Sequence, residues 1–373
     1  MFSHHNKKRG VNRIMYARVR GYLFSIPTTT EIEVDDTYGT VRNVVVSGWD
    51  SGAVDGSEHV APGIVQYINA VVTNADMRVR LIRLWSAIER CIEYDQSQSY
   101  YSTIDPASVL KVFVAPEFYF APTMLPYTTC AHVGAYTRKE FTELYGALRN
   151  LILNYQAFHE NQQLKHWVFL CGTVVFDEGT EVPRRMLKNV MIAIGKRERD
   201  YQIKLIRKMT TSGIDGIAVQ EDYNYQVVYG NNQQEIDDHY LSLFHMFVEI
   251  CLEHRCGLLA DAKISWAQAN RNCPVQLQVI SAAGMTAITQ NVEDNAIVLR
   301  SDGYRYSDNR PMVSSHRKTA GNLTDETVSD IGIVDKPWND INVNAFRAET
   351  GATQWDVLTG KGSIPLIPGL YVF

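Results

Sequence analysis

Apolar residues along the chain follow two spacings, one typical of helices and one typical of buried strands. In residues 77–94 and 139–158 they recur every three to four positions, which places them on one face of a helix. The two stripes are Leu81, Leu84, Trp85, Ile88 and Ile92 in the first segment and Phe141, Leu144, Leu148, Leu151 and Ile152 in the second. We therefore predict two amphipathic helices that cover a core.

Short apolar runs around these helices predict strands that are buried on both faces. They are VRNVVVSGWD (41–50), LKVFVAPEF (110–118), HWVFLCGTVVF (166–176), NVMIAIG (189–195), YQIKLIRKM (201–209), LFHMFVEIC (243–251), VQLQVISAAG (275–284) and NAIVLRSDG (295–303). Interleaved strands and helices indicate an α/β protein whose sheets are covered by helices. No repeat or Pro/Gly/Ser linker divides the chain, so we predict one large domain over 41–310, preceded by an arm at 1–40 and followed by an extension at 311–373 that packs on the same domain.

Composition narrows the range of partners and compartments. The 373 residues are 45% hydrophobic and 21% charged, and the net charge of -5 gives no reason to expect a nucleic-acid partner. No apolar run reaches the roughly 20 residues that cross a bilayer, and the N-terminus lacks the apolar segment of a signal peptide. We expect a cytoplasmic protein without a membrane partner, although the basic stretch Lys7–Arg20 leaves another export signal open. Six scattered cysteines without CxxC spacing predict free thiols rather than a disulfide framework or zinc site.

Cys251 is the first candidate for chemistry, because it follows a largely apolar stretch and precedes the charged residues Glu253, His254 and Arg255. A side chain at such a strand end can face a cleft, which suits a nucleophile. The alternative interpretation is a buried structural cysteine, and this segment alone favours it.

Glu117 and a nearby pair of lysines give two more signals at strand ends. Glu117 follows an apolar strand and Pro116, where desolvation would raise its pKa toward that of a general base, but a surface glutamate is an equal alternative. Lys204 and Lys208 lie near the end of another strand, and a cation in a dry cleft can hold an oxyanion. Solvated edge charges are the alternative there. Because a parallel sheet gathers its strand ends along one edge, we expect the three groups to meet.

The order of VFVAPEF, FLCGTVVF with KNVMIAIG, a strand ending in lysine, and VEICLEHR resembles the nitrilase, or carbon-nitrogen hydrolase, superfamily over roughly residues 42–310. The resemblance implies a four-layer αββα sandwich and a catalytic set of Glu117, Lys208 and Cys251. The family lysine commonly stands soon after a tyrosine of the strand, which would be Lys204 after Tyr201. A position at the strand end instead favours Lys208, which we prefer. Phe118, Tyr119, Leu252 and Glu253 are expected to bind substrate.

The family mechanism implies hydrolysis of a small amide, or else of a nitrile or carbamoyl compound, through a thioester on Cys251, with no metal or organic cofactor. A homodimer or higher homo-oligomer is expected by the same resemblance. The insert 210–240 offers Asp215, Glu221, Asp222 and Glu235 as a second acidic group without a clear choice. Two alternatives stay open: a fold that binds a partner without catalysis, and a thiol hydrolase or acyltransferase that pairs Cys251 with His254.

Overall fold

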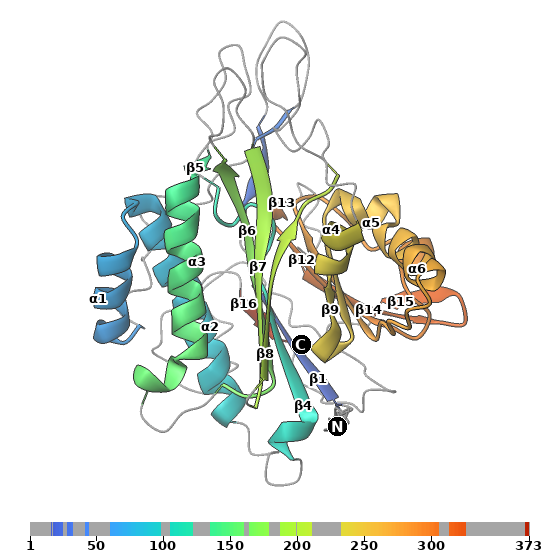
Figure 1. The fold of residues 1–373 in the computed structure, drawn as a ribbon, viewed down its shortest axis with the longest axis horizontal. Coiled ribbons are helices and arrows are strands. Elements are labelled where there is room, and N and C mark those ends of the chain that lie inside the picture. The colour runs from blue at the N-terminus through green and yellow to red at the C-terminus, as the bar shows by residue number, and fades with distance from the viewer. Residues whose placement is uncertain are drawn as a thin grey trace, which may run out of the picture.

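The computed structural model describes a mixed α/β protein with two multistranded sheets and a small third one (Figure 1). The described residues are 16, 18–24, 28–32, 42–44, 60–97, 105–121, 135–159, 164–178, 187–198, 200–210, 233–305, 313–325 and 370–372. Of the strand predicted at 41–50, only β3 (Arg42–Val44) lies within these residues, and it pairs with β2 (Thr29–Ile32) in the three-stranded sheet that β13 (Tyr304–Arg305) completes.

The larger sheet has seven strands in the order β16-β1-β4-β6-β7-β8, with β5 beside β6. Their bounds are β16 (Leu370–Val372), β1 (Arg18–Phe24), β4 (Val109–Val114), β6 (Trp167–Asp177), β7 (Leu187–Arg197), β8 (Asp200–Arg207) and β5 (Tyr136–Thr137). The strands β1, β4 and β6 are parallel, whereas β7 runs antiparallel to both β6 and β8. The strands β4 and β8 therefore end at the same edge of the sheet.

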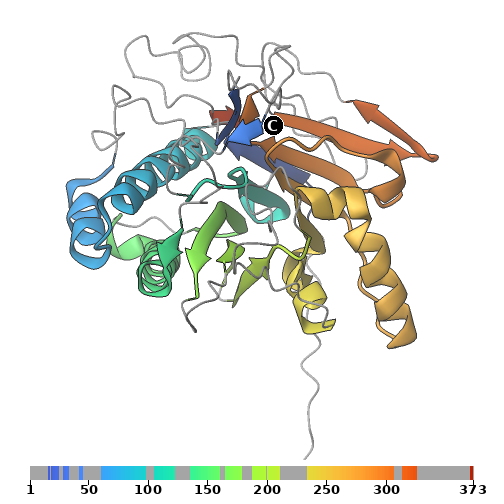
Figure 2. The same ribbon diagram turned by 90° about the horizontal axis from the view of Figure 1, so that it is seen from above.

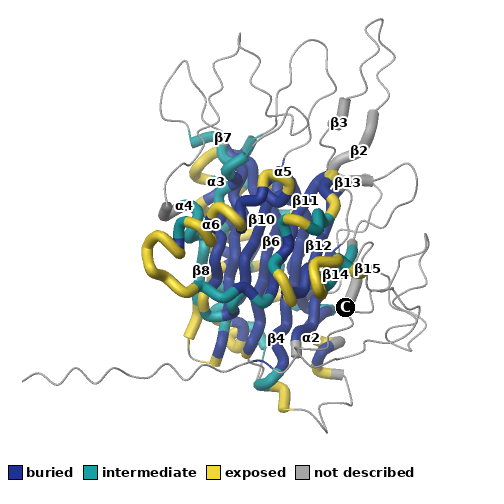
Figure 3. Tube along the Cα trace, turned by 90° about the vertical axis from the view of Figure 1, so that its right-hand side faces the viewer, coloured by how far each residue is buried: buried dark blue, intermediate teal, exposed yellow. Residues whose placement is uncertain are grey.

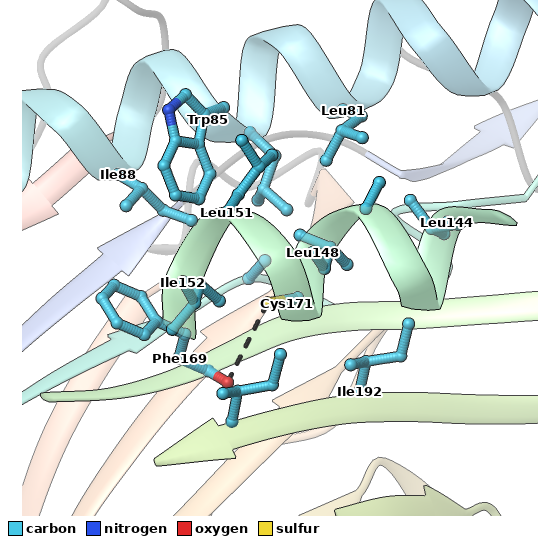
Figure 4. Close-up of a cluster of buried hydrophobic side chains, with 14 of the residues drawn as sticks. Leu81, Trp85, Ile88, Leu144, Leu148, Leu151, Ile152, Phe169, Cys171 and Ile192 are labelled. Atoms are coloured by element: carbon cyan, nitrogen blue, oxygen red, sulfur yellow. Dashed lines mark hydrogen bonds between the residues drawn. The ribbon is translucent and has the colours of Figure 1, made fainter. Parts of the chain in front are cut away.

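Three helices cover one face of this sheet: α1 (Pro62–Val71), α2 (Ala75–Ser97) and α3 (Arg138–Leu153). Both predicted apolar stripes are confirmed, because every residue in them is buried against the sheet. Figure 4 shows Trp85 and Ile88 of α2 and Leu148 and Ile152 of α3 above Phe169 of β6. The start of α3 is fixed by a capping box, in which Thr137 and Glu140 each bond the other's backbone amide.

The second sheet has the order β15-β14-β12-β11-β10-β9 and faces the first across a core of aliphatic side chains. Its strands are β9 (Tyr240–Leu241), β10 (Met246–Ile250), β11 (Leu277–Ala282), β12 (Ile297–Asp302), β14 (Val313–Thr319) and β15 (Asn322–Asp325). Helices α5 (Leu252–Cys256) and α6 (Leu258–Gln268) lie on the far side of this sheet from α1–α3, and α4 (Gln233–Asp238) lies between α6 and β8, the edge strand of the first sheet (Figures 1 and 2). Figure 3 shows the central strands, among them β6, β10, β11 and β12, as buried, while the edge strand β8 is only partly buried and α6 has an exposed face.

The predicted N-terminal arm is wrong for residues 18–24. They form β1, a strand inside the first sheet whose Tyr22, Leu23 and Phe24 are fully buried. The segment RVRGYLF does not show the pattern of a buried strand, because an arginine such as Arg20 is expected at the surface. In the structure its guanidinium is buried and paired with Asp95. The described parts of 311–373 also belong to the two sheets: β14 and β15 extend the second, and β16 pairs with β1.

Candidate active site

Cys251 lies between the end of β10 and the start of α5, in a backbone conformation that L residues rarely adopt. Its φ is 53° and its ψ is -108°, and such a left-handed residue costs on the order of 1–3 kcal/mol unless its surroundings hold it. Its amide donates to Ser281 O at 2.9 Å, and its Sγ lies 3.9 Å from Ala283 O. The side chain is 5% exposed. The turn thus fixes the thiol at the end of the strand, as the sequence predicts.

Glu117 lies in the turn that follows β4, and its side chain is fully buried. The amide of Glu117 donates to Ala282 O at 3.3 Å, and the hydroxyl of Thr28 donates to Glu117 O at 2.7 Å. The next residue, Phe118, has a φ of 60°, and its amide donates to Thr173 Oγ1 at 2.8 Å. The carboxylate is therefore placed by an anchored turn, and the alternative of a surface glutamate is wrong.

Lys208 follows β8 and reaches Glu117 across the edge of the sheet. Its Nζ lies 2.7 Å from Glu117 Oε1, and both side chains have no exposed surface. Lys204 instead pairs with Asp238 at 2.7 Å, so Lys208 is the lysine that the fold brings to Glu117. Two charges out of water require such a partner, because an unpaired buried charge is strongly destabilising.

Asn189 is a member of this cluster that the sequence analysis did not single out. Its Nδ2 donates to Glu117 Oε1 at 2.9 Å, and its backbone carbonyl accepts from the amide of Lys208 at 2.8 Å. Asn189 lies on β7, between the strands that lead to Glu117 and Lys208. The sequence does contain a sign of this role, because Asn189 is a polar side chain at the start of the otherwise apolar run NVMIAIG.

The end of β11 connects the two halves of the site. Three consecutive residues contact both: Ser281 accepts from the amide of Cys251, Ala282 accepts from the amide of Glu117, and Ala283 O faces the thiol. The hydroxyl of Ser281 also donates to Ala115 O at 3.0 Å, next to the Glu117 turn. Residues 281–283 thereby contact both Cys251 and the turn that carries Glu117, which is paired with Lys208.

The four predicted substrate-binding residues have different surroundings. Phe118 is buried and its ring lies 5.6 Å from Lys208 Nζ, while Leu252 packs in the apolar cluster that contains Cys251. Tyr119 points to the helix side of the sheet, where its hydroxyl donates to Arg80 O at 3.0 Å. The prediction that Tyr119 faces the site is therefore wrong. Residues 117–119 form a turn in which Phe118 has a φ of 60°, so the alternation of a strand does not hold there and Tyr119 does not share the side of Glu117.

Glu253 is fully buried and its carboxylate is occupied by the protein itself. Its Oε1 accepts from the amide of Met209 at 2.5 Å and its Oε2 from the amide of Ile250 at 2.7 Å. The prediction that Glu253 contacts substrate is wrong on this geometry. Its role is to hold two backbone segments together.

His254 does not face the thiol of Cys251 with an available nitrogen. Its Nε2 accepts from the amide of Ile288 at 2.8 Å, so Nδ1 carries the proton and donates to Glu249 Oε2 at 2.7 Å. Both ring nitrogens are engaged within the second sheet and its loop. This geometry speaks against a Cys251–His254 pair.

Among the candidates for a second acidic group, Glu235 lies on α4 and pairs with Arg207 at 3.1 Å. Asp215, Glu221 and Asp222 lie outside the described residues. Within the described part of the chain, no group of three or more His, Cys, Asp or Glu side chains could hold a metal ion, and the cysteines there are free thiols. None of the described helices is long and apolar enough to span a membrane.

Known proteins with a similar sequence could show whether Glu117, Lys208 and Cys251 belong to an established catalytic site. The sequence matches no family model and no curated protein.

Proposed function

We propose that the protein hydrolyses a carbon-nitrogen bond of a small amide by a Cys-Glu-Lys mechanism. The observation that carries the proposal is the fully buried Glu117–Lys208 pair, held by the same strand end that fixes the strained Cys251 turn. A nucleophile, a carboxylate that can exchange its proton and a cation for the developing charge are the three groups that such a reaction needs. They follow one another along the chain in the order that the nitrilase superfamily has.

The fold supports the same assignment. Helices α1–α3 pack on the first sheet, the two sheets pack against each other, and α5 and α6 pack on the second. This order of layers is compatible with the αββα sandwich of the superfamily. By the same resemblance we propose a homo-oligomer, which analytical ultracentrifugation would test.

The proposed mechanism starts when Glu117 takes the proton of the Cys251 thiol and the thiolate attacks the carbonyl carbon. Lys208 and the backbone N–H of Leu252 stabilise the negative charge that develops on oxygen. Glu117 then protonates the departing amine as the carbon-nitrogen bond breaks, which leaves a thioester on Cys251. Water, deprotonated by Glu117, attacks the thioester and releases the carboxylic acid and the free thiol.

Phe118 and Leu252 supply apolar surface beside these groups, which suits the acyl portion of a small substrate. Amide hydrolysis is the first choice, and the same groups could attack a nitrile or a carbamoyl carbon. These substrates differ in their products, so a direct assay separates them.

The test measures ammonia or amine release from a panel of primary amides, N-carbamoyl compounds and nitriles, with intact-protein mass spectrometry to find an acyl group on Cys251. We expect at least one class to give both product and a hydroxylamine-sensitive adduct. Cys251→Ala should give neither. A wild-type protein that forms no adduct, and whose Cys251 thiol is inert, would contradict the proposal and favour a binding protein of the same fold.

A further inference from the structure

We infer that His239 and Glu253 form an ionic clamp that positions Lys208 relative to Cys251, an inference that rests on the proposed function. The two residues lie outside the triad. Between them they bond the backbone on both sides of Lys208 and the strand that leads to Cys251.

The carboxylate of Glu253 binds one residue beside each functional group. It accepts from the amide of Met209, the residue after Lys208, and from the amide of Ile250, the residue before Cys251. Each oxygen accepts one N–H bond, an arrangement that the ionised carboxylate, with acceptors on both oxygens, satisfies best. An amide in its place has an NH2 donor where one oxygen stood, so it could not accept from both amides in this geometry.

His239 supplies two further bonds across the same gap. Its Nδ1 lies 2.7 Å from Val248 O on β10, and its Nε2 lies 3.2 Å from Arg207 O on β8. A carbonyl oxygen only accepts, so both ring nitrogens carry a proton and His239 is an imidazolium. Its Nδ1 is 3.7 Å from Glu253 Oε2, and both side chains have no exposed surface. The two charges therefore balance inside the protein.

The four bonds of the clamp join the first sheet to the second. Arg207 and Met209 flank Lys208 at the end of β8, whereas Val248 and Ile250 lie on β10 just before Cys251. Burial raises the pKa of the Glu253 carboxyl, and the charge of His239, the two amide donors and the charge of Lys208 oppose this rise. Because Met209 directly follows Lys208, the bond from its amide to Glu253 places the clamp next to the lysine.

A second buried Glu–His pair in the same region provides a matched control. Glu249 and His254 are also fully buried and 2.7 Å apart. Within the described residues, Glu249 bonds groups of the second sheet and its helices, namely His254, Gln278 and the amide of Leu259. Its loss removes a charge of equal burial without a bond to the segment that carries Lys208.

The test compares Glu253→Gln, His239→Gln and the control Glu249→Gln in two measurements. The first is hydrogen exchange at the amide of Met209. The second is the alkylation rate of Cys251 relative to the exposed Cys256, followed by peptide mass spectrometry in the same molecule. Loss of a hydrogen bond to a charged acceptor should speed exchange at Met209 about tenfold or more in Glu253→Gln. A displaced lysine should slow Cys251 alkylation by about tenfold or more in both clamp variants.

Glu249→Gln should leave exchange at Met209 as in the wild type. The inference is overturned if either clamp variant folds and alkylates at Cys251 as fast as the wild type does, whatever its stability. If Cys251 of the wild type reacts no faster than Cys256, the proposed function fails, and exchange at Met209 still decides whether the clamp holds the lysine segment. Using two variants that break different bonds of the clamp keeps the test decisive if one of them does not fold.

Discussion

Two ends of the seven-stranded sheet bury charge, and they do so differently. At one end Arg20 of β1 pairs with Asp95 of α2 at 2.5 Å, and Tyr22 donates to the same carboxylate at 3.0 Å. Lys111 of the neighbouring strand is also buried there, which lowers its pKa to about 8. All four residues lie in regular strands or a helix, and the pairing joins the sheet to the helix that covers it.

At the other end the charges lie in turns and the contacts join one sheet to the other. Glu117 and Lys208 follow the ends of β4 and β8, and both Phe118 and Cys251 have a positive φ. Strain of this kind persists only where the surroundings hold it, and it concentrates at functional sites. A buried ion pair alone therefore does not distinguish the two ends of the sheet. The Glu117 end differs in that its charges follow strand ends, its backbone is strained, and the same strand end holds Cys251.

The largest expected effect comes from replacing Cys251 by two residues that both lack the thiol. Cys251→Ala and Cys251→Gly should each abolish adduct formation and reduce hydrolysis by on the order of 10³-fold or more, as removal of a nucleophile does. Because Cys251 has a φ of 53°, the glycine variant should be about 1 kcal/mol more stable than the alanine variant, against the usual order. Urea unfolding measures this difference, and an alanine variant that is the more stable would contradict strain at this turn.

The second prediction breaks the ion pair at each end of the sheet. Glu117→Gln and Asp95→Asn each leave a buried cation without its charge partner, so each should lower the free energy of unfolding by about 3–5 kcal/mol. Only Glu117→Gln should also lower hydrolysis, by about 10²–10⁴-fold, since it removes the general base. Unfolding and product release measured on both variants decide the comparison. Equal activity losses would show that both act through stability alone.

The third prediction concerns the turn that holds Glu117. Gly172 has a φ of 77°, and a Cβ on it would lie 2.6 Å from Tyr119 Cβ and 2.9 Å from Pro116 O. Gly172→Ala should therefore cost about 1–3 kcal/mol and move the segment around Glu117. Gly146→Ala is the control, because nothing lies within 4 Å of its added Cβ in helix α3. That variant should gain roughly 0.5–1 kcal/mol with activity unchanged. Thermal unfolding and product release distinguish the two.

The last prediction concerns stability alone: a pH dependence in the helix layer that should leave hydrolysis unchanged. Burial raises the pKa of Glu89 to about 7, where the carboxyl bonds Trp85 and His159. Between pH 4.5 and 7 the folded protein keeps the proton of Glu89, while the unfolded chain releases it. The contribution of this proton to the free energy of unfolding is therefore complete below about pH 4.5 and is lost as the pH rises through 7. The free energy of unfolding of the wild type minus that of Glu89→Gln should therefore decrease as the pH is raised from 4.5 to 7. A difference that does not change with pH would contradict the assignment.

The sequence predicted the elements whose patterns are local. The stripes of α2 and α3 follow from helical spacing, and Glu117, Lys208 and Cys251 each stand at the end of an apolar run. β1 escaped prediction because Arg20 is buried by a partner 75 residues away. The roles of Asn189, His239 and Glu253 likewise depend on contacts between strands that are distant along the chain. Such contacts leave no local pattern, so only the fold reveals them.

The most direct test of the central claim is the alkylation of Cys251 and Cys256 in one molecule by limiting iodoacetamide, followed by peptide mass spectrometry. Cys251 is 5% exposed, whereas Cys256 is exposed, so access alone would favour Cys256. If Glu117 and Lys208 activate the thiol, Cys251 should react about tenfold faster or more, and Glu117→Gln should remove that advantage. Faster reaction at Cys256, or a Cys251 rate that is the same in Glu117→Gln, would contradict the account.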